Sequence, residues 1–102
     1  MGKTTRIIAT CLLAAGLGGC SGSKDFTPTQ GMAPEAIFAE ACSTCHGENG
    51  GGKLGFLLSI AGTDTSVEEI VNKIQNGGHI MPAFPNIGAT EARAVAEYIK
   101  AQ

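Results

Sequence analysis

The chain has 102 residues, a formal net charge of −2, four Cys and no Trp. Its seven basic residues do not form a cluster, which excludes the basic footprint of a nucleic-acid-binding protein. The 69 residues from Pro34 to the end are few for an apolar core, and domains of that size usually need a disulfide, a metal or a cofactor for stability.

The first 19 residues are predicted to be a lipoprotein signal peptide. Lys3 and Arg6 precede an apolar run over 7–17, which is too short for a membrane-spanning helix of about 20 residues. Residues 17–20, Leu-Gly-Gly-Cys, resemble the bacterial lipobox, which implies cleavage before Cys20 and lipidation of that cysteine. Buried acyl chains contribute about 0.8 kcal/mol per methylene, so they would hold the protein on a membrane. The alternative is an ordinary signal peptide in which Cys20 is incidental.

Residues 20–33 are predicted to form the lipidated end and a flexible tether, because they contain Pro28 and two glycines and show no apolar period. The protein is therefore expected on the extracytoplasmic face of a bacterial membrane, on the periplasmic side or at the cell surface. From residue 20 onward the chain has five basic and nine acidic residues. We expect a basic partner surface, or docking that depends weakly on charge.

Residues 34–102 are predicted to form one all-α domain. Pro34 suits the first turn of a helix and Glu35 suits its positive end, so a first helix is expected to begin there. Five glycines between 47 and 55 predict a loop after it. Apolar residues recur at helical spacing before this loop and predict one buried face: Ile37, Phe38, Ala41 and Cys45.

Two more helices are expected further along the chain. Thr65 and Glu68 are spaced as in a capping box, which predicts the start of a second helix, and Asn76-Gly77-Gly78 predicts its end. A third helix is expected to start near Thr90. Each has one apolar face: Val67, Ile70, Val71 and Ile74 in the second helix, and Ala92, Val95, Ala96 and Ile99 in the third.

The sequence Cys42-Ser43-Thr44-Cys45-His46 is a c-type haem attachment motif. Two cysteines three positions apart on a helical turn can reach the two vinyl groups on one porphyrin edge, and the next residue projects its imidazole toward the iron. A haem would also fill the centre of so small a core. We therefore predict one haem c, bound covalently through Cys42 and Cys45, with His46 as an iron ligand.

Other uses of this motif need a different context. A thioredoxin-like Cys-x-x-Cys accompanies a βαβ pattern, whereas this sequence shows no strand-type alternation. A zinc site needs four ligands, and His79 would be the only candidate for the fourth. A plain disulfide suits an oxidising compartment but leaves His46 and the small core unexplained.

From Pro34 to Ala101 the chain resembles the class I cytochromes c. The resemblance rests on the order of an aromatic residue before the haem motif, a glycine-rich loop after it, a Met-Pro pair and an aromatic-aliphatic pair in the last helix. Here these are Phe38, residues 47–52, Met81-Pro82 and Tyr98-Ile99. The resemblance implies a small fold of about three main helices wrapped around the haem, in which we expect Phe38 and Tyr98 to join the terminal helices.

The resemblance also implies that Met81 is the second axial ligand, and a thioether there raises the reduction potential relative to a second imidazole. His79 is a rival for that position and Met32 a remote one, while a purely core-filling Met81 is the remaining alternative. The Gly-Pro whose carbonyl orients the proximal imidazole in much of the family is absent from residues 53–57. Another carbonyl must therefore orient His46, and the sequence does not identify it.

The predicted function is that of an electron carrier, not an enzyme, which docks its redox partner proteins at an exposed haem edge and is held on a membrane through Cys20. A ligand-binding or peroxidatic haem protein is one alternative, and it predicts an open sixth coordination position. An electron-relay subunit of a larger oxidoreductase is the other, and it would copurify with a partner.

Overall fold

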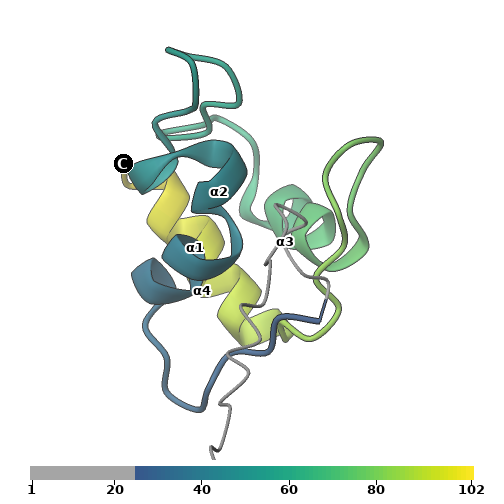
Figure 1. Ribbon diagram of the computed structural model, residues 1–102. Coiled ribbons are helices and arrows are strands. Elements are labelled where there is room, and N and C mark those ends of the chain that lie inside the picture. The colour runs from purple at the N-terminus through teal and green to yellow at the C-terminus, as the bar shows by residue number, and fades with distance from the viewer. Residues whose placement is uncertain (1–24) are drawn as a thin grey trace, which may run out of the picture.

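The computed structural model describes residues 25–102 (Figure 1). The predicted signal peptide (1–19), the predicted lipidation site Cys20 and residues 21–24 of the predicted tether lie outside the described residues. The described part is all-α, as predicted, and none of its helices is long and apolar enough to cross a membrane. Its helical elements are α1 (Pro34–Ala41), α2 (Ser43–His46), the short 3-10 turn η1 (Glu48–Gly50), α3 (Val67–Asn76) and α4 (Ala89–Lys100).

The chain bends between α1 and α2, and this bend decides which cysteine faces the core. α1 begins at Pro34, as predicted, and ends at Ala41; the next residue, Cys42, caps the helix with a φ of −116° and a ψ of −36°. Cys42 is 7% exposed, whereas Cys45 lies at the surface. The predicted buried face is confirmed for its first three residues and wrong for Cys45, because that prediction assumed one unbroken helix.

The capping box of α3 lies one residue later than predicted. Ser66, not Thr65, is the N-cap: its hydroxyl accepts a hydrogen bond from the Glu69 N–H at 3.2 Å, and the Glu69 carboxylate accepts one from the Ser66 N–H at 3.2 Å. The Thr65 N–H instead donates to the hydroxyl of Thr63 at 3.2 Å. Both registers have a hydroxyl residue followed three positions later by Glu, so only the backbone path distinguishes them. The helix ends before Gly77, as predicted, and Gly77 has a φ of 72°.

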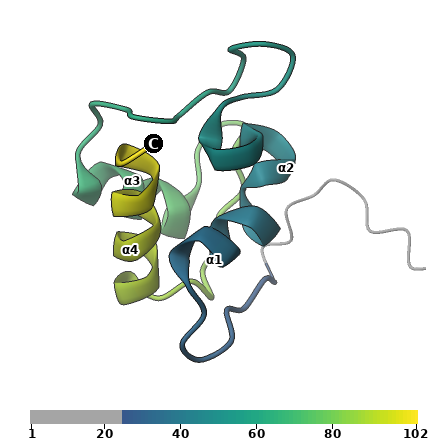
Figure 2. The same ribbon diagram turned by 90° about the vertical axis from the view of Figure 1, so that its left-hand side faces the viewer.

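The core forms where α4 packs against both α1 and α3 (Figures 1 and 2). The rings of Phe38 and Tyr98 join the terminal helices as predicted, with centroids 5.5 Å apart and planes tilted by 54°. α4 begins at Ala89, next to the predicted Thr90, and all four residues of its predicted apolar face are buried. The buried apolar residues are Ile37, Phe38, Ala41, Cys42, Ile74, Phe84, Ile87, Ala92, Val95, Ala96 and Ile99.

Irregular segments make up the rest of the described chain. The connection 51–66 leads from η1 to α3, and the connection 77–88 leads from α3 to α4. Within residues 25–102 the sole β-type pairing is an isolated bridge between Lys53 and Leu57. Residues 25–33 contain no helix, but Phe26 and Met32 are partly buried against the core. Part of the predicted tether therefore lies on the domain, and its boundary at residue 33 stays a prediction.

Candidate functional site

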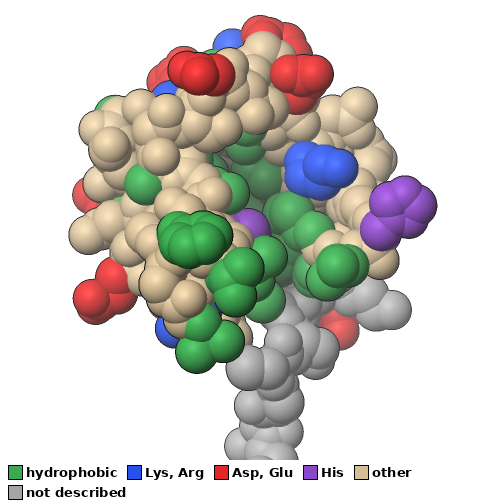
Figure 3. Space-filling model, turned by 90° about the horizontal axis from the view of Figure 1, so that it is seen from above, with side chains coloured by type: hydrophobic (Ala, Val, Ile, Leu, Met, Phe, Trp, Pro, Cys, Tyr) green, Lys and Arg blue, Asp and Glu red, His purple; other side chains and the backbone are tan. Residues whose placement is uncertain are grey.

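A cavity of about 500 Å³ opens between α2, α3 and the two connections, with one residue of α4 in its wall. This volume lies in the range of roughly 300–1,000 Å³ that is usual for cofactor and small-molecule sites. Figure 3 shows apolar side chains gathered around the hollow on one face of the molecule. The cavity is lined by His46, Ile60, Thr63, Thr65, Glu69, Ile70, Asn72, Lys73, Ile74, Gly77, Met81 and Ile99.

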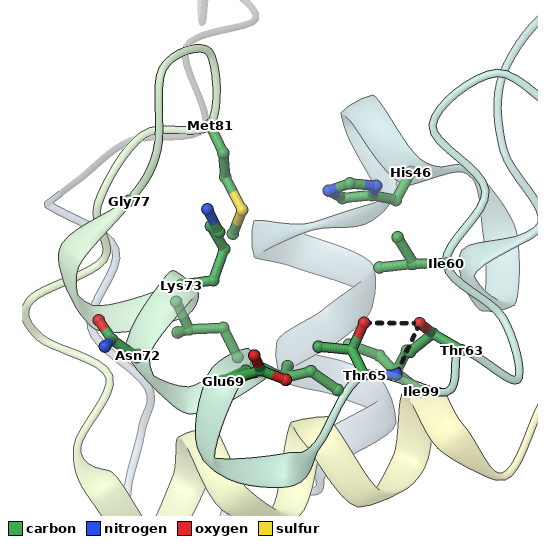
Figure 4. Close-up of a pocket in the computed structure, with 12 residues that line it drawn as sticks. His46, Ile60, Thr63, Thr65, Glu69, Asn72, Lys73, Gly77, Met81 and Ile99 are labelled. Carbon is green, nitrogen blue, oxygen red and sulfur yellow. Dashed lines mark hydrogen bonds between the residues drawn. The ribbon is translucent and has the colours of Figure 1, made fainter.

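His46 is the last residue of α2, and a hydrogen bond fixes its ring. Its Nδ1 lies 2.7 Å from the carbonyl oxygen of Leu58. Because a carbonyl oxygen only accepts hydrogen bonds, Nδ1 carries the hydrogen and Nε2 keeps a free lone pair. Figure 4 shows the ring directed into the cavity. Nε2 is therefore available as a metal ligand, and the hydrogen bond at Nδ1 makes it a stronger one.

The carbonyl that orients His46 belongs to an unusual backbone turn. Leu58 has a φ of 61°, a left-handed conformation that residues other than glycine rarely adopt. Two backbone hydrogen bonds hold the turn in place: the Gly52 N–H donates to the His46 carbonyl at 2.6 Å, and the Lys53 N–H donates to the Leu57 carbonyl at 2.8 Å. Sequence reasoning missed Leu58 because no proline marks it and a leucine at positive φ has no sequence signature.

Met81 enters the cavity from the connection between α3 and α4, opposite the imidazole (Figure 4). This connection is tightly folded at its start, where the Gly78 N–H donates to the Met81 carbonyl at 2.9 Å. A Cβ at Gly77 would stand 2.8 Å from that same carbonyl oxygen, so the turn requires glycine there. The Phe84 N–H donates to the Ile74 carbonyl of α3 at 2.7 Å. These contacts fix the position of Met81 relative to α3.

The two rivals of Met81 lie elsewhere. His79 is exposed and does not line the cavity, although it is only two residues from Met81. Met32 packs against the apolar core and does not line the cavity either. Of the three side chains that the sequence offers opposite His46, Met81 is the one that reaches the cavity.

The two motif cysteines lie in different environments. Burial, together with the nearby Cys45, raises the pKa of the Cys42 thiol to about 12, so this thiol is protonated at neutral pH. Cys45 is exposed. Neither cysteine lines the cavity. The structure thus brings His46 and Met81 together at one cavity and leaves the cysteines on the α1–α2 segment that leads to it.

Two hydrogen bonds that sequence reasoning missed connect one wall of the cavity to α4. The ammonium group of Lys100 donates hydrogen bonds to the Thr63 carbonyl at 3.1 Å and to the Thr65 carbonyl at 2.6 Å. Both threonines line the cavity. Because these partners lie 37 and 35 positions apart in the sequence, no local pattern predicts the contact.

The donor set of the cavity fits a haem iron. Residues 25–102 contain no group of three or more His, Cys, Asp or Glu side chains that could hold a metal ion, so a zinc site of protein ligands finds no support there. An imidazole nitrogen and a thioether sulfur instead face each other across the cavity, which are the axial donors of His/Met haems. Four isoleucines supply an apolar wall suited to a porphyrin: Ile60, Ile70, Ile74 and Ile99.

Comparisons with known proteins identify the family of the chain. The model of the family described as "Cytochrome C oxidase, cbb3-type, subunit III" matches residues 29–99, a range that includes both motif cysteines and every residue lining the cavity. The chain is also similar to Cytochrome c-550 of Bacillus subtilis (strain 168), with 44% identity over 50 residues. That similarity covers 49% of this chain and 42% of the relative, so the chain matches less than half of that protein's length.

Proposed function

The chain belongs to the cytochrome c family, and we propose that it is an electron carrier with one haem c, attached to Cys42 and Cys45 and ligated by His46 and Met81. Membership of the family implies haem-based electron transfer and a covalently bound haem. The observation that carries the proposal is the pairing of His46 and Met81 across one cavity, in a chain whose Cys-x-x-Cys-His motif ends at His46.

The chain's own residues would hold this site rigid and set its potential. When bound, a haem supplies a reversible one-electron couple. The thioether of Met81 favours the reduced state, whereas the hydrogen bond from His46 to the Leu58 carbonyl makes the imidazole more basic and favours the oxidised state. Backbone contacts hold both ligands, so little rearrangement is needed when an electron arrives or leaves.

Exposed apolar side chains support docking of redox partner proteins at the face that holds the cavity. Leu54, Phe56 and Ile80 are 90%, 85% and 94% exposed, and they lie on the two connections that border the cavity. Residues 51–62 and 77–88 contain no Asp or Glu, although the described residues hold nine acidic and four basic side chains. Exposed apolar surface of this kind marks interaction sites. A partner protein with an apolar contact area surrounded by basic residues would complement this face and the acidic remainder of the described chain.

Membrane attachment is a further part of the proposal. We propose that the chain is cleaved before Cys20, lipidated there and held outside the cytoplasm, with residues 20–33 as the tether and 34–102 as the haem domain. The lipobox-like residues 17–20 support this. Replacement of Cys20 by Ser should move the haem-loaded protein from the membrane fraction to the soluble one. A variant that stays in the membrane fraction would refute a lipid anchor at Cys20.

One observation favours a second role, that of an electron-relay subunit. The matching family model is described as a subunit of a cbb3-type cytochrome c oxidase. A subunit would copurify with its complex after mild detergent extraction, whereas a carrier would be isolated alone. The remaining alternative, a ligand-binding or peroxidatic haem protein, requires an open sixth position, and the placement of Met81 in the cavity weighs against it.

The deciding experiment compares optical spectra of the haem-loaded protein with those of Met81→Ala and Met32→Ala. Met32 is the matched control, because it is the other methionine of the described chain and packs outside the cavity. We expect the weak far-red band of a sulfur-ligated ferric haem in the wild type and in Met32→Ala, and its loss in Met81→Ala. A wild type that is high-spin, or that readily takes up exogenous ligands, would instead favour ligand-binding chemistry.

A further inference from the structure

Tyr98, in the last turn of α4, makes a hydrogen bond that core packing does not require. Its ring packs against Phe38, whereas its hydroxyl donates to the side-chain oxygen of Asn49 at 2.7 Å. A phenylalanine would make the same ring contact without this bond. Asn49 lies in η1, three residues after His46, and adopts a φ of 52°. The hydroxyl therefore attaches α4 to the turn that follows the proposed iron ligand.

Gly50, the next residue of η1, accepts several hydrogen bonds from the connection that leads to α3. Its carbonyl accepts bonds from the Ile60 N–H at 2.9 Å, the Ala61 N–H at 3.0 Å and the Ser59 hydroxyl at 3.3 Å. Gly50 is buried and has a φ of 75°. A Cβ added there would stand 3.2 Å from the Ala61 nitrogen, so the two backbones are in close contact. The position of η1 therefore sets the position of this part of the connection.

The same part of the connection begins directly after the carbonyl that orients His46. Leu58, whose carbonyl oxygen lies 2.7 Å from His46 Nδ1, precedes Ser59 in the chain. A hydrogen bond weakens when its geometry changes, and this one makes the imidazole more basic. A shift of η1 would move residues 59–61 and, with them, the Leu58 carbonyl. Tyr98 does not line the cavity, but it is linked to His46 by this series of hydrogen bonds.

We propose that Tyr98 is a positioning residue for the proximal ligand: its hydroxyl holds η1, and thereby the Leu58 carbonyl, in the place where that carbonyl accepts the hydrogen bond from His46. This inference rests on the proposed function, since it takes His46 as an iron ligand. A more basic imidazole favours the oxidised iron, so the hydroxyl of Tyr98 lowers the reduction potential. Because a tyrosine hydroxyl and an amide are neutral, the effect acts through geometry and not through charge.

The test removes the hydroxyl and keeps the ring. Tyr98→Phe retains the contact with Phe38, whereas Asn49→Gly removes the acceptor and suits the positive φ of this position. Thr27→Val is the matched control, because it also removes a hydroxyl, one that donates to the Asp25 carbonyl at 3.2 Å and lies outside the site. The wild type and all variants are compared as haem-loaded proteins.

Hydrogen exchange in the reduced protein measures the effect on the connection. Loss of one hydrogen bond changes a local opening equilibrium by a factor of about five. We therefore expect Tyr98→Phe to speed exchange about fivefold at the Ile60 and Ala61 amides and at the His46 Nδ1 hydrogen. The Phe84 amide, which donates to α3, is the internal reference. It should keep its rate, since a general loss of stability would speed exchange there as well.

Redox titration measures the effect on His46. Tyr98→Phe and Asn49→Gly should both raise the midpoint potential, and the double variant should add nothing to the larger single effect, because both changes break the same bond. Thr27→Val should keep the potential of the wild type. A Tyr98→Phe variant with an unchanged potential, or with exchange that speeds equally at the Phe84 amide, would overturn the inference. The proposed function fails separately, through a wild type that carries no haem or lacks the spectrum of sulfur ligation.

Discussion

The left-handed backbone conformation of Leu58 allows a test of how this residue holds the proposed iron ligand His46. At a φ of 61° a residue with a side chain is strained by about 1–2 kcal/mol, and a glycine is not. We therefore expect glycine to be better tolerated than alanine at this position, the reverse of their order in a helix. Proline, whose φ is fixed near −65°, cannot adopt this conformation at all.

The magnitudes follow from the surroundings of Leu58. Leu58 is 54% exposed, so truncation of its side chain loses about half of the usual burial energy, or about 1 kcal/mol. Leu58→Ala should lower the free energy of unfolding by that amount. Leu58→Gly loses the same contacts but is relieved of the strain, and its greater freedom in the unfolded chain costs about 0.5–1 kcal/mol. Leu58→Gly should therefore be about 0.5–1 kcal/mol more stable than Leu58→Ala.

Denaturant unfolding of the haem-loaded variants, with the haem absorbance as the probe, measures these differences. In parallel, redox titration should show wild-type potentials for Leu58→Gly and Leu58→Ala, because both keep the carbonyl that holds His46. Leu58→Pro should turn that carbonyl away, lower the stability most and raise the potential, since the imidazole becomes less basic. An alanine variant as stable as the glycine variant, or a proline variant with an unchanged potential, would refute this account of Leu58.

Three further predictions test other parts of the site. Met81→Ala should open a coordination position, so that the reduced haem-loaded protein binds carbon monoxide within the mixing time of a spectroscopic experiment while Met32→Ala does not. Gly47→Ala should be destabilised by more than about 1 kcal/mol in chemical denaturation, because Gly47 has a φ of 75° and an added Cβ would collide with the backbone of Gly52. Gly31→Ala is the control: Gly31 has a φ of 76° but open space around it, so this variant has the backbone strain without the collision. Ser66→Ala should cost about 1 kcal/mol of stability by removing the N-cap of α3, whereas Thr65→Ala should cost less, and equal losses would contradict the observed register of the capping box.

Local patterns in the sequence were sufficient for the three longer helices and for the proposed ligand His46, whereas Met81 was proposed from the resemblance to a known family. The apolar period of Ala92, Val95, Ala96 and Ile99 predicted the buried face of α4, because residues at this spacing lie on one side of a straight helix. The same reasoning was wrong for Cys45, where the helix breaks at Cys42 and the period no longer applies. The capping box of α3 was wrong by one residue, because two overlapping matches to the pattern are equivalent until the backbone chooses one.

The sequence by itself predicted an all-α chain and a haem attachment motif over 42–46, since each depends on neighbouring residues alone, and the resemblance to a known family pointed to Met81. Only the tertiary structure decided that the Leu58 carbonyl holds His46 and that Met81, not His79, reaches the cavity. The physical reason is that these arrangements depend on how two long irregular connections fold back over the helices. Hydrogen bonds and packing between residues far apart in the sequence determine how these connections fold, and no periodic pattern in the sequence predicts such contacts.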